Sequence, residues 1–174
     1  MRIIETKVYK FDELSEKVKK TVLASLAEIN IQDGWWNGTI EDAENIGLKI
    51  VCFELYESVP YAKGTFSVDA LEVGANILRD HGKHCKTYKL AETFLENHAP
   101  IYSEYLDSES EHYESPDHER KLMELEEGFL TDLLDEYSNM LCKDKNYLYS
   151  DEAIIETIDD RNYEFTEDGK LWIN

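Results

Sequence analysis

Two short segments gather side chains that could bind a metal ion or carry out catalysis. In the first, His112 and His118 stand among the carboxylates of Glu114, Asp117 and Glu119. Such a mixture of imidazole and carboxylate groups can hold Mn²⁺ or a similar cation. The surrounding residues are polar and acidic, so we interpret the segment first as a solvated loop. A metal-dependent enzyme that uses His112, His118 and the nearby carboxylates is the alternative.

The second segment, His81-Gly82-Lys83-His84-Cys85, resembles a zinc-binding cluster in its composition. A zinc site needs about four ligands, and no second pair of cysteines or histidines stands at a suitable spacing. The three cysteines are far apart and odd in number, which favours reduced thiols. We therefore predict that the protein binds no metal and no cofactor.

The sequence motifs of the common catalytic sites are missing. The chain has no GxSxG, no P-loop, no GxGxxG after a strand and no HExxH. Carboxylates are abundant, but abundance alone does not indicate an acid–base pair. We therefore predict a protein that is not an enzyme and has no catalytic residues.

Charge is the strongest signal in the composition. The chain has 38 acidic and 18 basic residues, a net charge of −20, and residues 101–160 alone carry 19 acidic and 4 basic residues. A surface of this sign repels phosphate backbones, so no direct binding of nucleic acid is expected. It would attract a basic protein surface, or serve only to keep the protein soluble.

The residues predicted to contact such a basic partner are carboxylates and a pair of tryptophans. The carboxylates lie on a predicted long helix and in the loop before it, and an exposed tryptophan is a common interface anchor. The predicted set is Glu109, Glu111, Glu114, Glu119, Glu124, Glu127, Asp132, Asp135, Glu136, Trp35 and Trp36. Carboxylates on a rigid helix lose less entropy on binding than a loop does, and they could imitate nucleic-acid phosphates.

Hydrophobic periodicity predicts an α+β fold for a single domain of residues 1–174. The predicted strands are residues 2–11, 48–56, 65–68, 163–166 and 171–173, the last two joined by an Asp168-Gly169 turn. We expect a small mixed or antiparallel sheet of four or five strands, packed with about five helices.

Capping residues and apolar spacing place the helices. They are predicted from residue 12 or 15 to about 29, from 39 to 46, from 69 to 81, over 86–106, over 117–141 and from Ser150 to about 158. Pro100 is expected to kink or interrupt its helix. The helix over 117–141 is acidic and amphipathic, within the acidic helical segment of about 101–160. Its broad apolar stripe predicts core packing, with a homodimer contact as a further option.

The ends of the chain resemble a group of phage and prophage proteins. The similarity lies in Tyr9-Lys10-Phe11-Asp12-Glu13-Leu14-Ser15-Glu16-Lys17-Val18-Lys19-Lys20, in Trp35-Trp36 with Ile40-Glu41-Asp42-Ala43 and Ile46-Gly47-Leu48-Lys49-Ile50, and in Tyr163-Glu164-Phe165-Thr166-Glu167-Asp168-Gly169-Lys170-Leu171. Some proteins of this group are labelled antitoxin-like. The resemblance implies an origin in a phage or mobile element, and it transfers no catalytic residue.

Charge and resemblance together predict a phage-encoded inhibitor without enzymatic activity. It would bind the basic nucleic-acid-binding surface of a bacterial defence protein, a nuclease or a subunit of a CRISPR guide complex. One alternative is an antitoxin-like protein that neutralises a basic toxin. The chain has no apolar run of about 18 residues and no signal peptide, so we expect it in the cytoplasm of the host and away from membranes.

Overall fold

The contacts within the chain group into two compact units. A computed structural model describes residues 6–55 and 59–172. One unit combines Met1–Trp35 with Lys143–Asn174, and the other is Trp36–Cys142. Within the described residues no helix has both the length and the apolar character needed to cross a membrane.

The first unit combines short elements from the two ends of the chain. These are the 3-10 helix η1 (Phe11–Glu13), α1 (Glu16–Ser25), α6 (Asp151–Asp160), β3 (Glu164–Phe165) and β4 (Leu171–Trp172). Its apolar core consists of Phe11, Leu14, Val22, Ile154, Ile158 and Phe165. The predicted tail hairpin is present, with Phe165 opposite Leu171 and Gly169 in the left-handed region at φ 85°.

The predicted first strand is wrong over its described part. Residues 2–5 lie outside the described residues, and beyond them only Tyr9 pairs, through an isolated antiparallel bridge to Phe165. Phe11 then begins a 3-10 helix and is buried in the core of the unit. The alternation of apolar and polar residues therefore reflects a chain that packs on the hairpin at Tyr9 without forming a strand.

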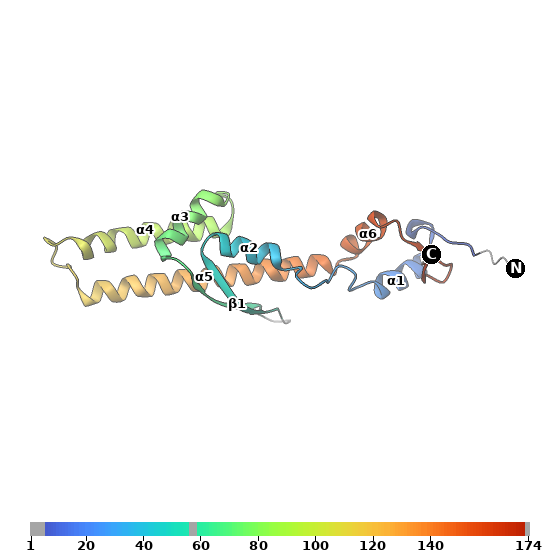
Figure 1. Ribbon diagram of the computed structural model, residues 1–174, viewed down its shortest axis with the longest axis horizontal. Coiled ribbons are helices and arrows are strands. Elements are labelled where there is room, and N and C mark those ends of the chain that lie inside the picture. Colours follow the sequence, from blue (N-terminus) through green and yellow to red (C-terminus); the bar gives the residue numbers. More distant parts are fainter. Residues whose placement is uncertain (1–5, 56–58, 173–174) are drawn as a thin grey trace. The chain divides into compact units, whose positions relative to one another are not determined.

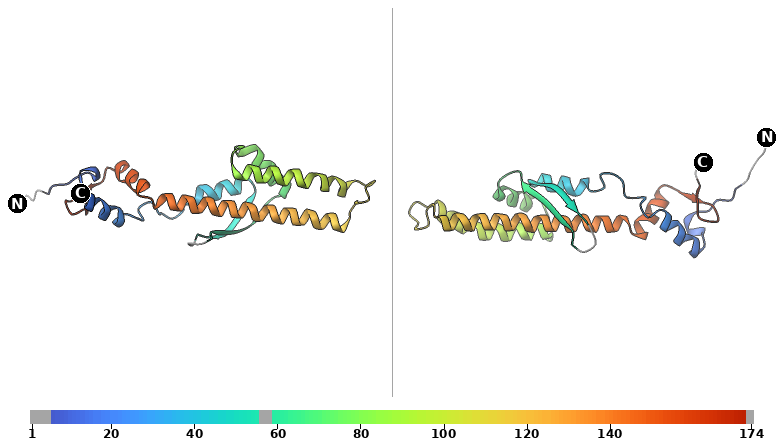
Figure 2. Two further views of the ribbon diagram at one scale, coloured as in Figure 1. Left: turned by 180° about the vertical axis from the view of Figure 1, so that it is seen from behind. Right: turned by 90° about the horizontal axis from the view of Figure 1, so that it is seen from below.

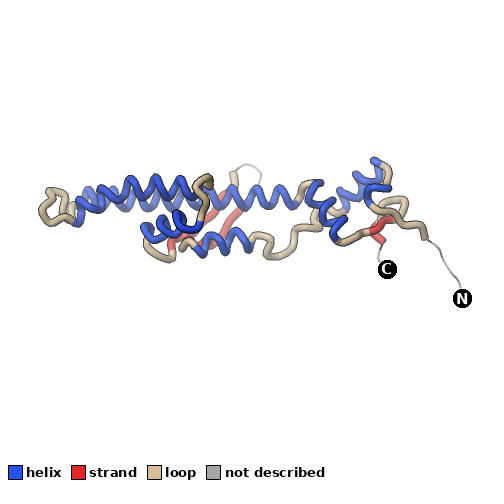
Figure 3. The backbone as a smooth tube through the Cα atoms, turned by 90° about the horizontal axis from the view of Figure 1, so that it is seen from above, coloured by secondary structure: helices blue, strands red, loops and turns tan. Residues whose placement is uncertain are grey.

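The second unit consists of three shorter elements and a helical hairpin. They are α2 (Asn37–Asn45), α3 (Ala70–Asp80) and the antiparallel pair β1 (Leu48–Glu54) and β2 (Tyr61–Phe66), followed by α4 (Lys86–Leu106) and α5 (Pro116–Leu148). The last residues of α5, from Lys143 on, group with the first unit. In both views of Figure 2, α4 lies alongside α5, and Figure 3 shows how much of this unit is helical.

The mixed α+β class is confirmed, whereas the single sheet of four or five strands is not found. The described strands form two separate sheets of two strands, β1 with β2 and β3 with β4. Six α-helices are present among the described residues, close to the number expected. β2 begins at Tyr61, four residues before its predicted start, because Lys63 and Gly64 hide the strand pattern in the sequence.

Two of the predicted helix caps are confirmed, whereas Thr39 is not a cap, because α2 begins at Asn37 after Trp36, and Ser15 precedes α1 without a capping hydrogen bond from its side chain. The Asp69 carboxylate accepts a hydrogen bond from the backbone N–H of Leu71 at the start of α3, and Ser150 Oγ accepts one from Ala153 at the start of α6. Pro100 does not interrupt α4, which continues to Leu106. A proline inside a helix removes one backbone hydrogen bond and its ring crowds the carbonyl four residues earlier, so the turn at Pro100 is expected to be a weak point of α4.

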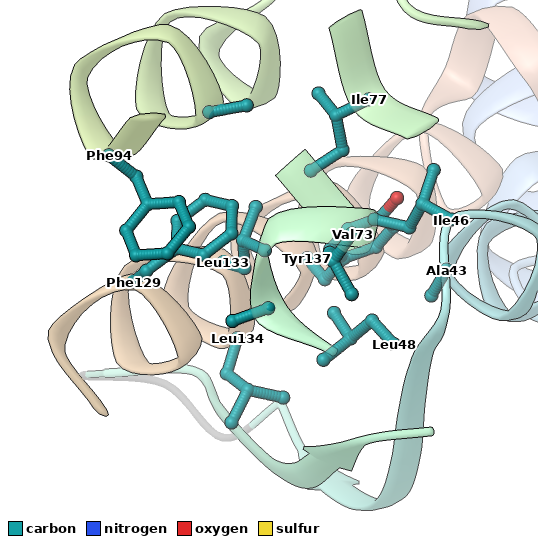
Figure 4. Packing of buried hydrophobic residues seen from close by; sticks show 12 residues of the cluster. Ala43, Ile46, Leu48, Val73, Ile77, Phe94, Phe129, Leu133, Leu134 and Tyr137 are labelled. Atoms are coloured by element: carbon teal, nitrogen blue, oxygen red, sulfur yellow. The ribbon is translucent and has the colours of Figure 1, made fainter. Parts of the chain in front are cut away.

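The apolar stripe of α5 forms the floor of the core in the second unit. Phe129, Leu133 and Tyr137 are almost completely buried, and they contact residues from α2, β1, α3 and α4 (Figure 4). The rings of Phe94 and Phe129 stack with centroids 4.2 Å apart and planes only 4° from parallel. The stripe therefore packs within its own unit, as predicted from the sequence when it was assigned to core packing.

Candidate functional site

Side-chain pairs fix the register of α4 against α5. Their order is reversed along the two helices, so each step forward on α4 matches a similar step back on α5, as in an antiparallel hairpin (Figure 1). The pairs are Lys86 with Glu136 at 2.6 Å, the stacked Phe94 and Phe129, His98 with Glu126 at 3.2 Å, and Glu104 with His118 at 3.2 Å. This register decides which other side chains meet between the helices.

A set of exposed carboxylates, here called the acidic face, lies on α5 and around the tip of this hairpin. We define it as the eleven exposed carboxylates of Glu104, Asp107, Glu109, Glu111, Glu114, Asp117, Glu119, Glu124, Glu127, Asp132 and Asp135. Two exposed basic residues, Arg120 and Lys121, lie in the same stretch. Arg120 pairs with Asp117 at 3.3 Å and with Glu124 at 2.9 Å, and these carboxylates raise the pKa of its guanidinium. The face thus keeps a large negative charge.

Three residues of the predicted contact set do not lie where the sequence suggested. Glu136 is buried, with 8% of its surface exposed, because it faces α4 and bonds Lys86. Trp35 and Trp36 are half-buried, so neither is the exposed anchor that was expected. Trp36 packs edge-on against Phe53 of β1, with ring centroids 5.9 Å apart. The eight remaining predicted carboxylates all belong to the acidic face.

A groove of about 220 Å³ runs between α4 and α5 within this face. Its floor is apolar, formed by Leu90, Phe94, Leu125 and Phe129, and its lining includes Thr93, Asn97, Gly128 and the carboxylates of Glu124 and Asp132. A Cβ atom at Gly128 would have nothing within 4 Å, so the glycine leaves open space there. Apolar floor and charged rim together suit a long basic side chain.

Two histidines and a carboxylate meet at the tip of the hairpin. One potential ligand atom from each of Glu104, His112 and His118 lies within 4.8 Å of the others. The two imidazole rings stack with centroids 4.2 Å apart, and His118 is buried. The sequence identified this histidine pair, but the carboxylate of the group comes from the end of α4, not from Glu114, Asp117 or Glu119. Only the helix register could have revealed Glu104.

The sequence did not predict a polar network on the other side of the core. The Tyr137 hydroxyl donates to Asp42 Oδ2 at 2.7 Å, and Asp42 Oδ1 lies 3.6 Å from His81 Nε2. His81 Nδ1 lies 2.7 Å from the hydroxyl of Thr87. Burial and the bond to Asp42 raise the pKa of Tyr137 above its ordinary value, so this phenol stays a hydrogen-bond donor.

This network borders a cavity of about 430 Å³, whose lining also includes the free thiol of Cys85. Lys86 and Glu136, which also line the cavity, bind each other. His84 and Cys85 are exposed, and among the described residues they do not join a group of three converging metal ligands. The network therefore joins α2, the α3–α4 turn and α5, and residues 81–85 form the turn between α3 and α4.

Comparison with known proteins found no matching family model, curated protein or solved structure. Function is therefore inferred from the side chains of the α4–α5 hairpin. Its acidic face, its groove and the group at its tip are features of the described hairpin that a ligand or partner could contact.

Proposed function

We propose that the protein is a phage-encoded inhibitor without enzymatic activity, which binds the basic nucleic-acid-binding surface of a bacterial defence protein. The observation that carries this proposal is the acidic face, with eleven exposed carboxylates against two exposed basic residues. A nuclease or a subunit of a guide complex offers the complementary surface, rich in Arg and Lys. Charge complementarity of this kind speeds encounter and selects the partner.

The hairpin holds its carboxylates in fixed positions. Asp117, Glu124 and Asp135 recur at intervals of seven and eleven residues, which places them on one side of α5. The rise of a helix separates Asp117 from Glu124 by roughly 10 Å along the axis. The backbone of α5 already holds these carboxylates in place, so binding a partner costs little conformational entropy at this row.

The groove provides a specific contact within the face. The methylene groups of an inserted Arg or Lys would lie on Phe94 and Phe129, and its charge would reach Glu124 or Asp132 at the rim. A bidentate bond from a guanidinium to a carboxylate is among the stronger polar contacts. We therefore propose an arginine of the partner as the occupant of the groove.

The first test compares two variants that each lose four charges. One replaces Glu124 and Glu127 with Gln and Asp132 and Asp135 with Asn, on the acidic face. The control replaces Glu152 and Glu167 with Gln and Asp159 and Asp160 with Asn, which are exposed residues of the first unit. Binding to a panel of purified defence nucleases and guide complexes is measured at about 0.05 M and 0.5 M salt, where surface charges are weakly and strongly screened.

We expect a partner that binds the native protein and the control variant at low salt, but binds the face variant at least tenfold more weakly. High salt should weaken the native complex. Equal binding by both variants, or a complex indifferent to salt, would show that the acidic face is not the contact surface.

The groove is tested separately with two substitutions at one position. Gly128→Leu fills the groove with a side chain that favours helix, whereas Gly128→Ala adds one methyl group in open space. We expect the leucine variant to lose partner affinity and the alanine variant to keep it. Unchanged binding of the leucine variant would refute insertion of a side chain at this point.

A further inference from the structure

The tip of the α4–α5 hairpin brings together three donor groups from three different segments. Glu104 lies in the last turn of α4, His112 in the connection between the helices and His118 in the first turns of α5. The connection is closed by a backbone hydrogen bond from Glu114 to the carbonyl of Tyr105, at 3.0 Å. A second bond, from the His112 N–H to Ser110 Oγ at 3.1 Å, holds the backbone at His112.

We propose that Glu104, His112 and His118 bind one divalent transition-metal ion, and that zinc(II) fits best. Two imidazoles and one carboxylate are one of the donor sets found in zinc sites with three protein ligands. The hard cations Ca²⁺ and Mg²⁺ prefer sites made of oxygen atoms alone. The site is separate from the groove and does not depend on the proposed inhibitor function.

His118 is the buried member of the proposed ligand group. Its side chain is 7% exposed, and its Nε2 lies 3.2 Å from Glu104 Oε2. Its Nδ1 is buried and, among the described residues, has no hydrogen-bond partner. Because Nε2 is the nitrogen that faces Glu104, an ion would bind there and replace the direct contact between the two side chains.

Small movements would complete the coordination geometry. The donor atoms lie within 4.8 Å of one another. Zinc bonds of about 2.0–2.2 Å at tetrahedral angles place ligand atoms roughly 3.3–3.5 Å apart. The side chains of Glu104 and His112 are 56% and 39% exposed, so both can move toward the buried His118. Rotation of the exposed His112 ring out of its stack with His118 would direct a nitrogen to the ion.

A fourth ligand is available close to the group. Glu111 Oε1 lies 3.5 Å from His112 Nε2, and the Glu111 side chain is 88% exposed. Either this carboxylate or a water molecule would fill the remaining position. Binding would join the end of α4, the connection and the start of α5 through one ion, and would remove part of the negative charge at the tip.

The test uses the full chain without a histidine tag, stripped with a chelator and dialysed. Calorimetry with Zn²⁺ and visible absorption with Co²⁺ give the stoichiometry and affinity, and thermal unfolding gives a second readout. The variants are His112→Ala and Glu104→Gln, at side chains that are 39% and 56% exposed. His84→Ala is the control, an exposed histidine outside the group.

We expect one ion per chain, micromolar or tighter affinity, and a melting temperature raised by zinc. Each of the two variants should bind at least tenfold more weakly and lose the thermal shift, whereas His84→Ala should behave as the native chain. Absence of stoichiometric binding up to millimolar metal would overturn the proposal. So would equal affinity in the native chain and both site variants.

Discussion

The amine of Lys86 lies 2.6 Å from Oε2 of Glu136, and this contact joins an exposed cation to a buried carboxylate. Lys86 begins α4, and Glu136 lies on α5, where both border the cavity next to Asp42, His81 and Thr87. The hydrogen bond from Lys86 to Glu136 raises the pKa of the amine, with a further contribution from the negative charge. The pair thus sets the register at the end of the hairpin opposite the tip.

Lys86→Met should destabilise the second unit because it leaves the Glu136 carboxylate buried without its cation. We expect a loss of about 1–2 kcal/mol in the free energy of unfolding, less than for a fully buried pair because the amine reaches solvent. The double variant Lys86→Met with Glu136→Met should regain most of the loss. Denaturant unfolding followed by circular dichroism measures all three proteins. A single variant as stable as the native chain would show that the pair contributes nothing.

The contribution of the Lys86–Glu136 pair to the free energy of unfolding should also depend on pH. Because the folded state raises the pKa of Lys86, the contribution is complete below the ordinary lysine value of about 10.4. It is lost as pH rises through the higher folded value. The difference in unfolding free energy between the native chain and Lys86→Met should therefore shrink above about pH 10.4. A difference that stays constant to strongly alkaline pH would contradict this.

Tyr137 should resist ionisation until the protein unfolds. Burial raises the pKa of its hydroxyl, and the bond to Asp42 raises it further. Unfolding restores the ordinary value of about 10, so alkaline pH favours the unfolded state and stability falls as pH rises above about 10. Tyr137→Phe should cost about 1 kcal/mol at neutral pH through the lost hydrogen bond, yet flatten this alkaline decline.

Ultraviolet absorbance titration of the phenols and unfolding curves at several pH values would measure both effects of Tyr137→Phe. Tyr149→Phe, at an exposed side chain, is the control and should leave the alkaline decline unchanged. An equally steep decline in Tyr137→Phe would show that other groups cause it.

In the first unit, the side chain of Asn30 joins the N-terminal part of the chain to the C-terminal part. Its Oδ1 accepts a hydrogen bond from Thr157 Oγ1 of α6 at 2.6 Å, and its Nδ2 donates to the carbonyl of Leu148 at 3.3 Å. Asn30→Ala should lower the free energy of unfolding by about 1–2 kcal/mol because it removes both bonds. Thr157→Val removes one of them and should cost less. Equal stability of the alanine variant and the native chain would show that water replaces these bonds without loss.

Local sequence signals predicted where the helices lie better than they predicted which helices contact each other. Asp69 and Ser150 mark the starts of α3 and α6 because a capping side chain acts on N–H groups only two or three residues away. α5 continues seven residues beyond its predicted end at Leu141, because the apolar stripe fades there while helix-forming residues such as Lys143 and Lys145 continue. Periodicity marks the buried part of a helix rather than its end.

The candidate site was predictable only in part for the same physical reason. His112 and His118 are close in sequence and were recognised as a pair. Glu104 joins them through the register of α4 on α5, and Tyr137 meets Asp42 across 95 positions. No local pattern encodes such pairings, because they depend on how whole elements pack. Glu136 was predicted to contact a partner because a charged residue on a helix is usually exposed, whereas it is buried against Lys86 of α4.

Two glycines of the second unit should respond to alanine in opposite directions. Gly128 lies within α5, and a Cβ there would meet no atom within 4 Å. Gly128→Ala should therefore stabilise the helix by up to about 1 kcal/mol, since glycine is the poorer helix former. Gly47 follows α2 with φ at 91°, and its Cβ would lie 2.5 Å from Val68 Cγ2. Gly47→Ala should destabilise by about 2 kcal/mol, through the left-handed backbone and the clash.

Denaturant unfolding of the two glycine variants beside the native chain gives both signs in one experiment. Because each substitution adds the same methyl group, any difference between them comes from the local backbone and the space around the Cβ atom. If Gly128→Ala also destabilised the protein, the Cβ would not have the open space found at the groove, and the groove could not admit a partner side chain there. A neutral Gly47→Ala would mean that the turn after α2 relaxes away from Val68 and that the register of β1 does not depend on this glycine.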